Sequence, residues 1–194
     1  MSATLIYIHG FNSSPASFKA RLLQAALAAR APATPFLAPA LPYSPAAAAQ
    51  LLDDLVAAHR AAILVGSSLG GYYATWLAER HNLRAVLVNP AVRPYELLEG
   101  YVGRQKNLYT GEEYELTRGH IAELRALECA AITPQRYFLM VETGDEVLDY
   151  RQAVERYRGA QQLVIDGGDH GFGDFEKYLD AVFGYCSAPN IHPL

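Results

Sequence analysis

The stretch Ala62-Ile63-Leu64-Val65-Gly66-Ser67-Ser68-Leu69-Gly70 joins a short apolar run to the pattern Gly-x-Ser-x-Gly. The run predicts a strand covered on both faces, because apolar and polar residues do not alternate in it. Residues 69–80 continue with helical spacing, so the pattern lies at a strand-to-helix turn. So tight a turn raises the central serine above the edge of a sheet and leaves room only for glycine two positions away on either side. Ser68 is therefore the candidate nucleophile.

The neighbouring Ser67 does not satisfy the same pattern, because Val65 and Leu69 would stand where the glycines belong. An alternative reading of the stretch is an ordinary or phosphate-binding glycine loop between a strand and a helix. If Ser68 is instead a catalytic nucleophile, a base and an acid must be found elsewhere in the chain.

The same alternation of short apolar runs and amphipathic stretches recurs along the whole chain. Continuously apolar strands that alternate with helices predict an α/β fold, a doubly wound and mostly parallel sheet with helices on both faces. We expect strands at 5–8, 36–38, 62–65, 85–88, 137–141 and 163–165, and helices at 17–30, 46–59, 69–80, 148–157 and 172–183.

Residues 91–133 exceed what a simple connection between two strands needs. Their first half is rich in tyrosine and turn-forming residues, and residues 116–127 have helical spacing. Because insertions longer than ~15 residues are usually functional, we predict a lid-like segment over the strand ends, within one domain of residues 1–194. The sequence leaves open whether its tyrosines line the site or pack against the body. These are Tyr101, Tyr109 and Tyr114.

A serine hydroxyl needs a base to become a nucleophile, and the base needs a carboxylate to orient it. For a serine in such a turn the partners follow in the order acid, then histidine. His170 fits, because it lies in the glycine-rich loop after the apolar run 163–165. His192 also follows that run, but it belongs to the C-terminal tail.

The acid should leave the carboxyl end of the strand at 137–141. Asp145 does so, with Gly144 allowing the turn. Asp149 is the alternative, although its spacing suits a helix cap or a pair with Arg151. Glu142 and Glu146 are weaker candidates, the first still in the strand and the second expected to face solvent.

Acyl transfer also needs donors for a developing oxyanion. One should be the backbone N–H of Leu69, directly after the nucleophile, and the other the N–H of Phe11, in the loop after the first strand. His9 is then structural, and residues 12–15 are expected to brace this loop and cap the helix that begins near Ser17.

Composition narrows the possible partners. The chain has 194 residues and a formal net charge of −4 at pH 7, with a pI near 5.8. This balance gives nucleic acid or an anionic membrane no electrostatic attraction, so we predict neither as a partner. The only two cysteines, Cys129 and Cys186, are far apart and cannot supply a metal site. The first nine residues lack a cationic signal region and no long apolar span follows, so we expect a cytoplasmic protein.

With these motifs placed, the chain resembles the α/β-hydrolases and, more closely, the small YqiA/YcfP-type esterases of bacteria. The resemblance rests on five segments that extend over most of the chain: residues 7–15, 66–75, 109–112, 143–153 and 167–170. It implies a serine esterase acting on acyl esters or thioesters, with Ser68, Asp145 and His170 at the triad positions. The implied partner is a small-molecule acyl ester or thioester, and no metal or organic cofactor is expected. Because the chain has no space for a large separate cap domain beyond residues 91–133, we expect a shallow site that suits small or flexible acyl groups.

Two other functions remain open from the sequence. The same triad could pass the acyl group to another acceptor or cleave a thioester, as an acyltransferase or a thioesterase. A hydrolase-fold protein can also bind a small ligand without turning it over.

Overall fold

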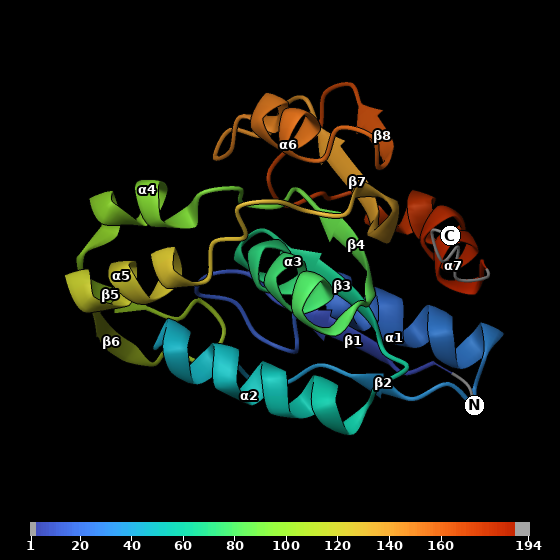
Figure 1. The fold of residues 1–194 in the computed structure, drawn as a ribbon, viewed down its shortest axis with the longest axis horizontal. Helices are drawn as coiled ribbons and strands as arrows, with labels where there is room; N and C mark the ends of the chain where they lie inside the picture. The colour runs from blue at the N-terminus through green and yellow to red at the C-terminus, as the bar shows by residue number, and fades with distance from the viewer. Residues whose placement is uncertain (1–2, 189–194) are drawn as a thin grey trace.

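In the computed structural model, which describes residues 3–188, six strands form one parallel sheet (Figure 1). The strand order is β2-β1-β3-β4-β7-β8, and every neighbouring pair is parallel. The predicted α/β fold class is confirmed. The strands are β1 Leu5–Ile8, β2 Phe36–Leu37, β3 Ile63–Ser67, β4 Arg84–Val88, β7 Tyr137–Glu142 and β8 Gln161–Ile165.

Helices cover both faces of this sheet, because successive residues of its strands point to opposite sides. On β1, Ile6 and Ile8 join a core with helices α2 and α3, whereas Leu5 and Tyr7 join a second core with α1 and α7. Helix α6 packs on the α2–α3 side through Ala153. The helices are α1 Phe18–Arg30, α2 Pro45–Ala58, α3 Leu69–His81, α6 Tyr150–Arg156 and α7 Leu179–Ser187.

The prediction of one helix over 172–183 is wrong at its start. Phe172 has a φ of +54°, which interrupts helical geometry, and its fully buried ring packs edge-on against that of Phe175. A short 3-10 helix (η3) then spans Phe175–Tyr178, and α7 follows it. The apolar residues that suggested a helix face instead fill the core beneath the loop.

The prediction that residues 12–15 cap the first helix is wrong, because α1 begins after Ser17 and has no side-chain cap. Ser17 precedes α1, but its hydroxyl donates to the Tyr7 Oη at 3.4 Å rather than capping the helix. Ser14 does brace the loop, as predicted, because its hydroxyl oxygen accepts the Ala16 N–H at 3.0 Å.

The segment between β4 and β7 contains a hairpin that the sequence pattern did not reveal. Strands β5 (Gly103–Lys106) and β6 (Glu113–Leu116) pair antiparallel, apart from the main sheet. Strand β5 contains no large apolar residue, and the alternation of polar and apolar residues in β6 is only four residues long, which is the shortest length that can mark a strand. Around the hairpin lie α4 Pro94–Leu98, the 3-10 helices η1 Glu99–Tyr101 and η2 Pro134–Arg136, and α5 Arg118–Ala126, which begins two residues later than predicted. Elements α4, β5, β6 and α5 gather at one end of the molecule, on the left in Figure 1.

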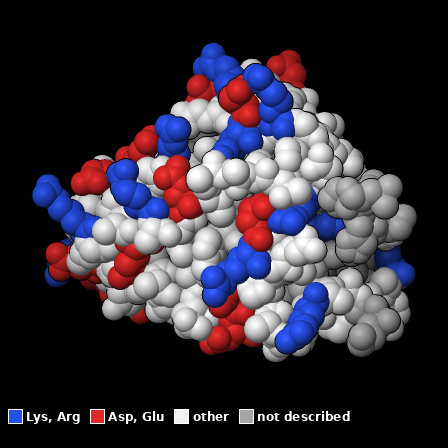
Figure 2. All heavy atoms as spheres, viewed as in Figure 1, with Lys and Arg blue, Asp and Glu red and all other residues white. Residues whose placement is uncertain are grey.

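Charged side chains of both signs are interspersed on the face shown in Figure 2. No large area of a single sign stands out there. Within residues 3–188, no helix is both long enough and apolar enough to cross a membrane.

Replacing Gly70 with alanine should destabilise the fold strongly. A Cβ at this position would lie 2.0 Å from the Ile8 carbonyl oxygen and 2.7 Å from that of His9. Both are backbone atoms at the end of β1 and cannot yield without moving the strand. We expect the free energy of unfolding, measured by urea titration, to fall by about 3 kcal/mol or more.

The matched control is Gly184→Ala on α7. A Cβ there meets no atom of the described residues within 4 Å, so a change of less than about 1 kcal/mol is expected. Equal urea midpoints for Gly70→Ala and the unmodified protein would contradict the close contact between α3 and β1.

Candidate active site

Ser68 lies between β3 and α3 in a conformation that a serine rarely adopts. Its φ is +55° and its ψ is −121°. Three backbone hydrogen bonds hold it there: its N–H donates to the Val88 carbonyl at 3.1 Å, and its own carbonyl accepts the N–H groups of Gly71 and Ala91. The surrounding backbone therefore over-determines the strained turn and fixes the direction of the hydroxyl.

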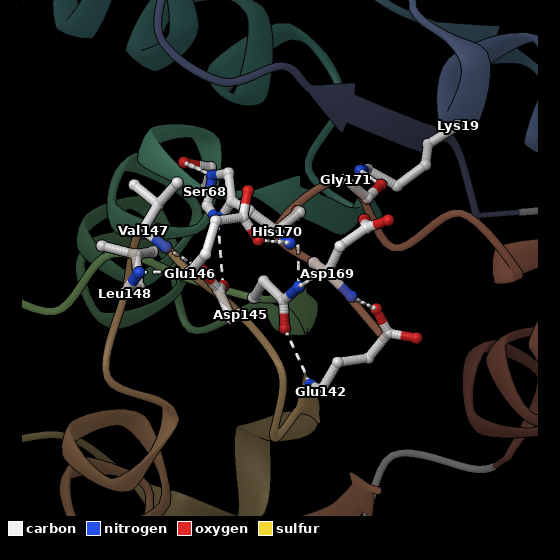
Figure 3. A network of polar contacts seen from close by, with 11 residues as sticks. Lys19, Ser68, Glu142, Asp145, Glu146, Val147, Leu148, Asp169, His170 and Gly171 are labelled. Carbon is white, nitrogen blue, oxygen red and sulfur yellow. Dashed lines mark hydrogen bonds and ion pairs between the residues drawn. The ribbon is translucent and has the colours of Figure 1, made fainter. Parts of the chain in front are cut away.

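The structure brings Ser68, His170 and Asp145 together at the carboxyl ends of β3, β8 and β7 (Figure 3). The Ser68 Oγ lies 3.0 Å from the His170 Nε2, and the His170 Nδ1 lies 2.8 Å from the Asp145 Oδ2. An ionised carboxylate only accepts, so the proton sits on Nδ1 and the lone pair of Nε2 faces the serine hydroxyl. The imidazole is thus oriented as a base toward Ser68.

The environment of Asp145 keeps its carboxyl ionised. Burial alone would raise its pKa, but hydrogen bonds from His170, Leu148 and Val147 outweigh burial and hold the pKa below its ordinary value. The two amides donate to Oδ1 at 2.8 and 2.9 Å, which leaves Oδ2 for the histidine. Each carboxylate oxygen therefore has a fixed partner.

The other acids considered from the sequence have different roles. The Asp149 Oδ1 caps α6 through the Arg151 N–H at 3.1 Å and pairs with the Arg151 Nε at 2.8 Å. Glu146 is exposed as predicted, yet its Oε2 accepts the backbone N–H of His170 at 3.0 Å. His192 lies outside the described residues.

Asn89 holds the histidine loop, and the sequence pattern showed it only as the end of a strand. It is 2% exposed, and its Nδ2 donates to the carbonyls of Asp169 and His170 at 3.0 and 3.3 Å. Its Oδ1 accepts the N–H of Glu142 at 3.0 Å. Asn89 therefore ties the backbone of the loop to the end of β7.

Glu142 supports the same loop from within the core. Its carboxyl is buried, and Oε2 accepts the Asp169 N–H at 2.9 Å (Figure 3). Burial raises the pKa of this carboxyl, the hydrogen bond from the Asp169 N–H opposes that rise, and the nearby carboxyls of Asp174 and Asp169 add to it, so the pKa stays above its ordinary value. Lys19 adds a hydrogen bond from its Nζ to the Gly171 carbonyl.

Glu142→Gln should make the protein more stable than the unmodified form as the pH rises. A carboxyl with a raised pKa in the folded state favours its protonated form, so its ionisation above the unfolded-state pKa near ~4.3 costs folding free energy. The introduced amide has a carbonyl oxygen that accepts and an NH₂ group that donates, so it can make the same hydrogen bonds as a protonated carboxyl. We expect the difference in free energy of unfolding to grow steadily between pH 4 and pH 7.5, measured by urea titration at each pH. A difference that shrinks as the pH rises would contradict this.

The backbone N–H groups of Leu69 and Phe11 are the donors predicted for an oxyanion. Leu69 begins α3, so its N–H is one of the helix donors without an intrahelical partner. The direction of the Phe11 N–H is set through the preceding carbonyl. The Gly10 oxygen accepts the His9 Nδ1–H at 3.0 Å and the Ser13 N–H at 3.3 Å, and in a trans peptide the following N–H points the opposite way.

His9 is a structural residue in this arrangement, as its sequence position suggested. Its Nε2 accepts the Leu41 N–H at 3.3 Å, so the proton must lie on Nδ1, where it bonds to the Gly10 carbonyl. Burial lowers the pKa of the ring and favours this neutral form. The loop runs close to the nucleophile, because a Cβ on Gly10 would lie 3.1 Å from the Ser68 Cβ.

A narrow pocket of about 60 Å³ opens beside both N–H groups. Its wall comes from the loop after β1, the connection between β2 and α2, the first turns of α3 and the segment between β4 and β7. Of the three tyrosines considered from the sequence, Tyr114 lines it and Tyr101 and Tyr109 do not. Among the lining residues are Phe11, Leu69, Tyr73, Leu98, Leu116 and Leu124. Within residues 3–188 no cluster of three or more metal-ligating side chains occurs.

A parallel sheet with a serine turn after β3, a carboxylate after β7 and a histidine after β8 defines the α/β-hydrolase fold. Alpha/beta hydrolase domain-containing protein 10 from mouse has this fold, with a TM-score of 0.71, 16% identity and coverage of 96% of this chain and 92% of its own. The esterase domain from a Rhodothermus marinus protein gives a TM-score of 0.65 at 15% identity, covering 94% and 85%.

The chain belongs to the family described as "Uncharacterised protein family (UPF0227)", whose model matches residues 4–186. The UPF0227 protein YcfP of Salmonella paratyphi A is 26% identical over 121 residues, which is 62% of each chain. The match thus spans less than two thirds of that relative's length. The family match confirms the resemblance to the YqiA/YcfP-type proteins.

Proposed function

We propose that the protein is a serine hydrolase that cleaves carboxylic esters or thioesters through an acyl-enzyme intermediate. The observation that carries the proposal is the continuous hydrogen-bonded series from Ser68 through His170 to Asp145. A serine needs such a base and orienting acid for nucleophilic attack, and the series ends beside two N–H groups. Similarity in fold to an esterase domain is consistent with this function.

The first half of the reaction acylates Ser68. His170 accepts the hydroxyl proton on Nε2 while the Ser68 Oγ attacks the substrate carbonyl carbon. The N–H groups of Phe11 and Leu69 donate to the oxyanion, each such donor being worth about 3 kcal/mol. Collapse of the tetrahedral intermediate breaks the bond to the alcohol or thiol, which leaves with the proton from His170.

The second half releases the acid. Water gives a proton to His170 and adds to the acyl carbonyl, and the new intermediate expels the Ser68 Oγ, which takes that proton back. Asp145 stays ionised throughout and stabilises the imidazolium that forms twice per cycle.

The pocket favours a small or slender acyl group. A volume of about 60 Å³ is well below the usual range for drug-sized ligands, and leucines line its inner wall. We expect hydrolysis of short acyl esters to exceed that of long or branched ones.

A fluorophosphonate probe tests the proposed function directly, because it reacts with a serine that its base has activated. We expect modification confined to Ser68, located by peptide mass spectrometry, and a matching preference for short p-nitrophenyl esters. A folded protein that the probe leaves unmodified would contradict the proposal and favour a ligand-binding role.

A further inference from the structure

The loop after β1 is attached to the β5–β6 hairpin by four hydrogen bonds. Three of them hold Asn12: its Oδ1 accepts from the Tyr114 Oη at 2.7 Å, its Nδ2 donates to the Gln105 Oε1 at 3.3 Å, and its carbonyl accepts the Leu108 N–H at 3.1 Å. The fourth runs from the Asn107 Nδ2 to the Ser13 carbonyl at 2.9 Å. We call these four bonds the hairpin clamp.

The clamped residues form a turn that needs outside support. Asn12 has a φ of +52°, a left-handed conformation that costs a residue with a side chain about 1 kcal/mol or more, although asparagine tolerates it better than most. The turn closes through the Ser13 N–H on the Gly10 carbonyl at 3.3 Å. The clamp therefore holds Asn12 and Ser13, and the turn closes only when these two residues are in place.

The closed turn sets the direction of the Phe11 N–H. Its closing bond falls on the Gly10 oxygen, and that carbonyl shares a rigid trans peptide with the Phe11 N–H. If Asn12 or Ser13 moves, the Gly10 carbonyl loses one of its two donors and the peptide plane can rotate. Hydrogen bonds to an oxyanion depend steeply on such a rotation.

We propose that the β5–β6 hairpin is a fixed clamp for the oxyanion loop, with Tyr114 and Asn107 as positioning residues for the Phe11 N–H. The inference rests on the proposed function, since it concerns a donor in that reaction. It gives the segment between β4 and β7 a role in the transition state as well as in the pocket wall.

The hairpin is built to hold its clamping groups still. The Asn107 Oδ1 accepts the N–H groups of Tyr109 and Thr110, which fixes the turn between β5 and β6. The Tyr114 ring stacks on that of Tyr43, with centroids 4.9 Å apart and planes inclined by 18°. Burial raises the pKa of Tyr114 to about 12, so its hydroxyl remains a donor at any ordinary assay pH.

Tyr114→Phe removes the shortest bond of the clamp and keeps the ring. We expect kcat for a short p-nitrophenyl ester to fall by about tenfold, with KM changed less than about twofold, because only the transition state uses the donor fully. The affinity for a short alkylboronic acid, whose adduct with Ser68 is tetrahedral, should fall by about the same factor.

Asn107→Asp tests the second attachment cleanly. The introduced carboxylate keeps the acceptor that Tyr109 and Thr110 need, but it cannot donate to the Ser13 carbonyl. A similar fall in kcat and boronate affinity is expected. The control is Tyr109→Phe, a half-exposed tyrosine of the same hairpin outside the pocket, which should match the unmodified protein.

Unchanged kcat and boronate affinity in both variants, with an active unmodified protein, would overturn this inference alone. A change in KM without a change in kcat would do the same, since it would leave Tyr114 only a part of the pocket wall. An unmodified protein with no Ser68-dependent hydrolysis or labelling would overturn the proposed function and this inference together.

Discussion

Replacing Ser68 with alanine will lower kcat for ester hydrolysis by about 10⁶-fold while the fold persists. Among residues 3–188, the hydroxyl that lies within hydrogen-bond distance of the His170 Nε2 is that of Ser68, so the variant leaves this base without its side-chain nucleophile. Any hydrolysis by this variant above the uncatalysed rate would come from the oxyanion donors and from substrate binding. Within the described part of the chain the Ser68 hydroxyl has no hydrogen-bond partner other than His170, so the melting temperature should stay within a few degrees.

Ser67→Ala provides the matched control. It makes the same chemical change one position earlier, on a buried serine that ends β3 and lies outside the pocket. We expect its kcat to remain within about threefold of the unmodified protein. If Ser68→Ala retained more than a hundredth of the activity in a purified sample, hydrolysis would have to occur at another site.

Asp145→Asn is expected to lower kcat by about 10⁴-fold. The amides of Val147 and Leu148 both donate to Oδ1, so the introduced side chain must place its carbonyl oxygen there. Its NH₂ group then faces the His170 Nδ1, which can only accept. The proton moves to Nε2, and an Nε2–H cannot take the proton of Ser68.

Asp149→Asn separates this effect from a general loss of negative charge. Asparagine caps a helix about as well as aspartate does, so α6 should be retained and kcat should change less than about twofold. Equal losses in the two variants would contradict the assignment of Asp145 as the orienting acid. The measurement is kcat for ester hydrolysis near neutral pH, determined with both purified variants.

The sheet was predictable because its central strands β1, β3, β4 and β7 are largely apolar and buried, and the edge strands β2 and β8 each include a short apolar run. All six predicted strands occur, and β1 has the predicted ends. The β5–β6 hairpin was missed because β5 has no large apolar residue, the alternation in β6 is only four residues long, and the two strands pair only with each other. The start of α7 was missed because the buried Phe172 and Phe175 mimic one face of a helix.

The three residues that meet at the site could be identified because each follows an apolar strand, and parallel strands end at one edge. The residues that hold the surrounding loops in place could not be identified in this way. Asn89, Glu142 and Asn107 act on backbone atoms far away in the chain, and such bonds place no constraint on neighbouring residue types. Only the folded geometry shows that a strand-ending asparagine and a polar hairpin hold the loops beside Ser68.

The all-parallel order of the main sheet has a consequence for how the chain folds. No two neighbouring strands can be joined by a tight turn, so every pairing must first close a long loop. The β4–β7 pair joins residues about fifty positions apart, against about twenty for β3–β4, which adds about 0.8 kcal/mol of closure entropy. The hairpin within that connection forms from local contacts alone, and by shortening the free chain it reduces this cost before the last strands dock.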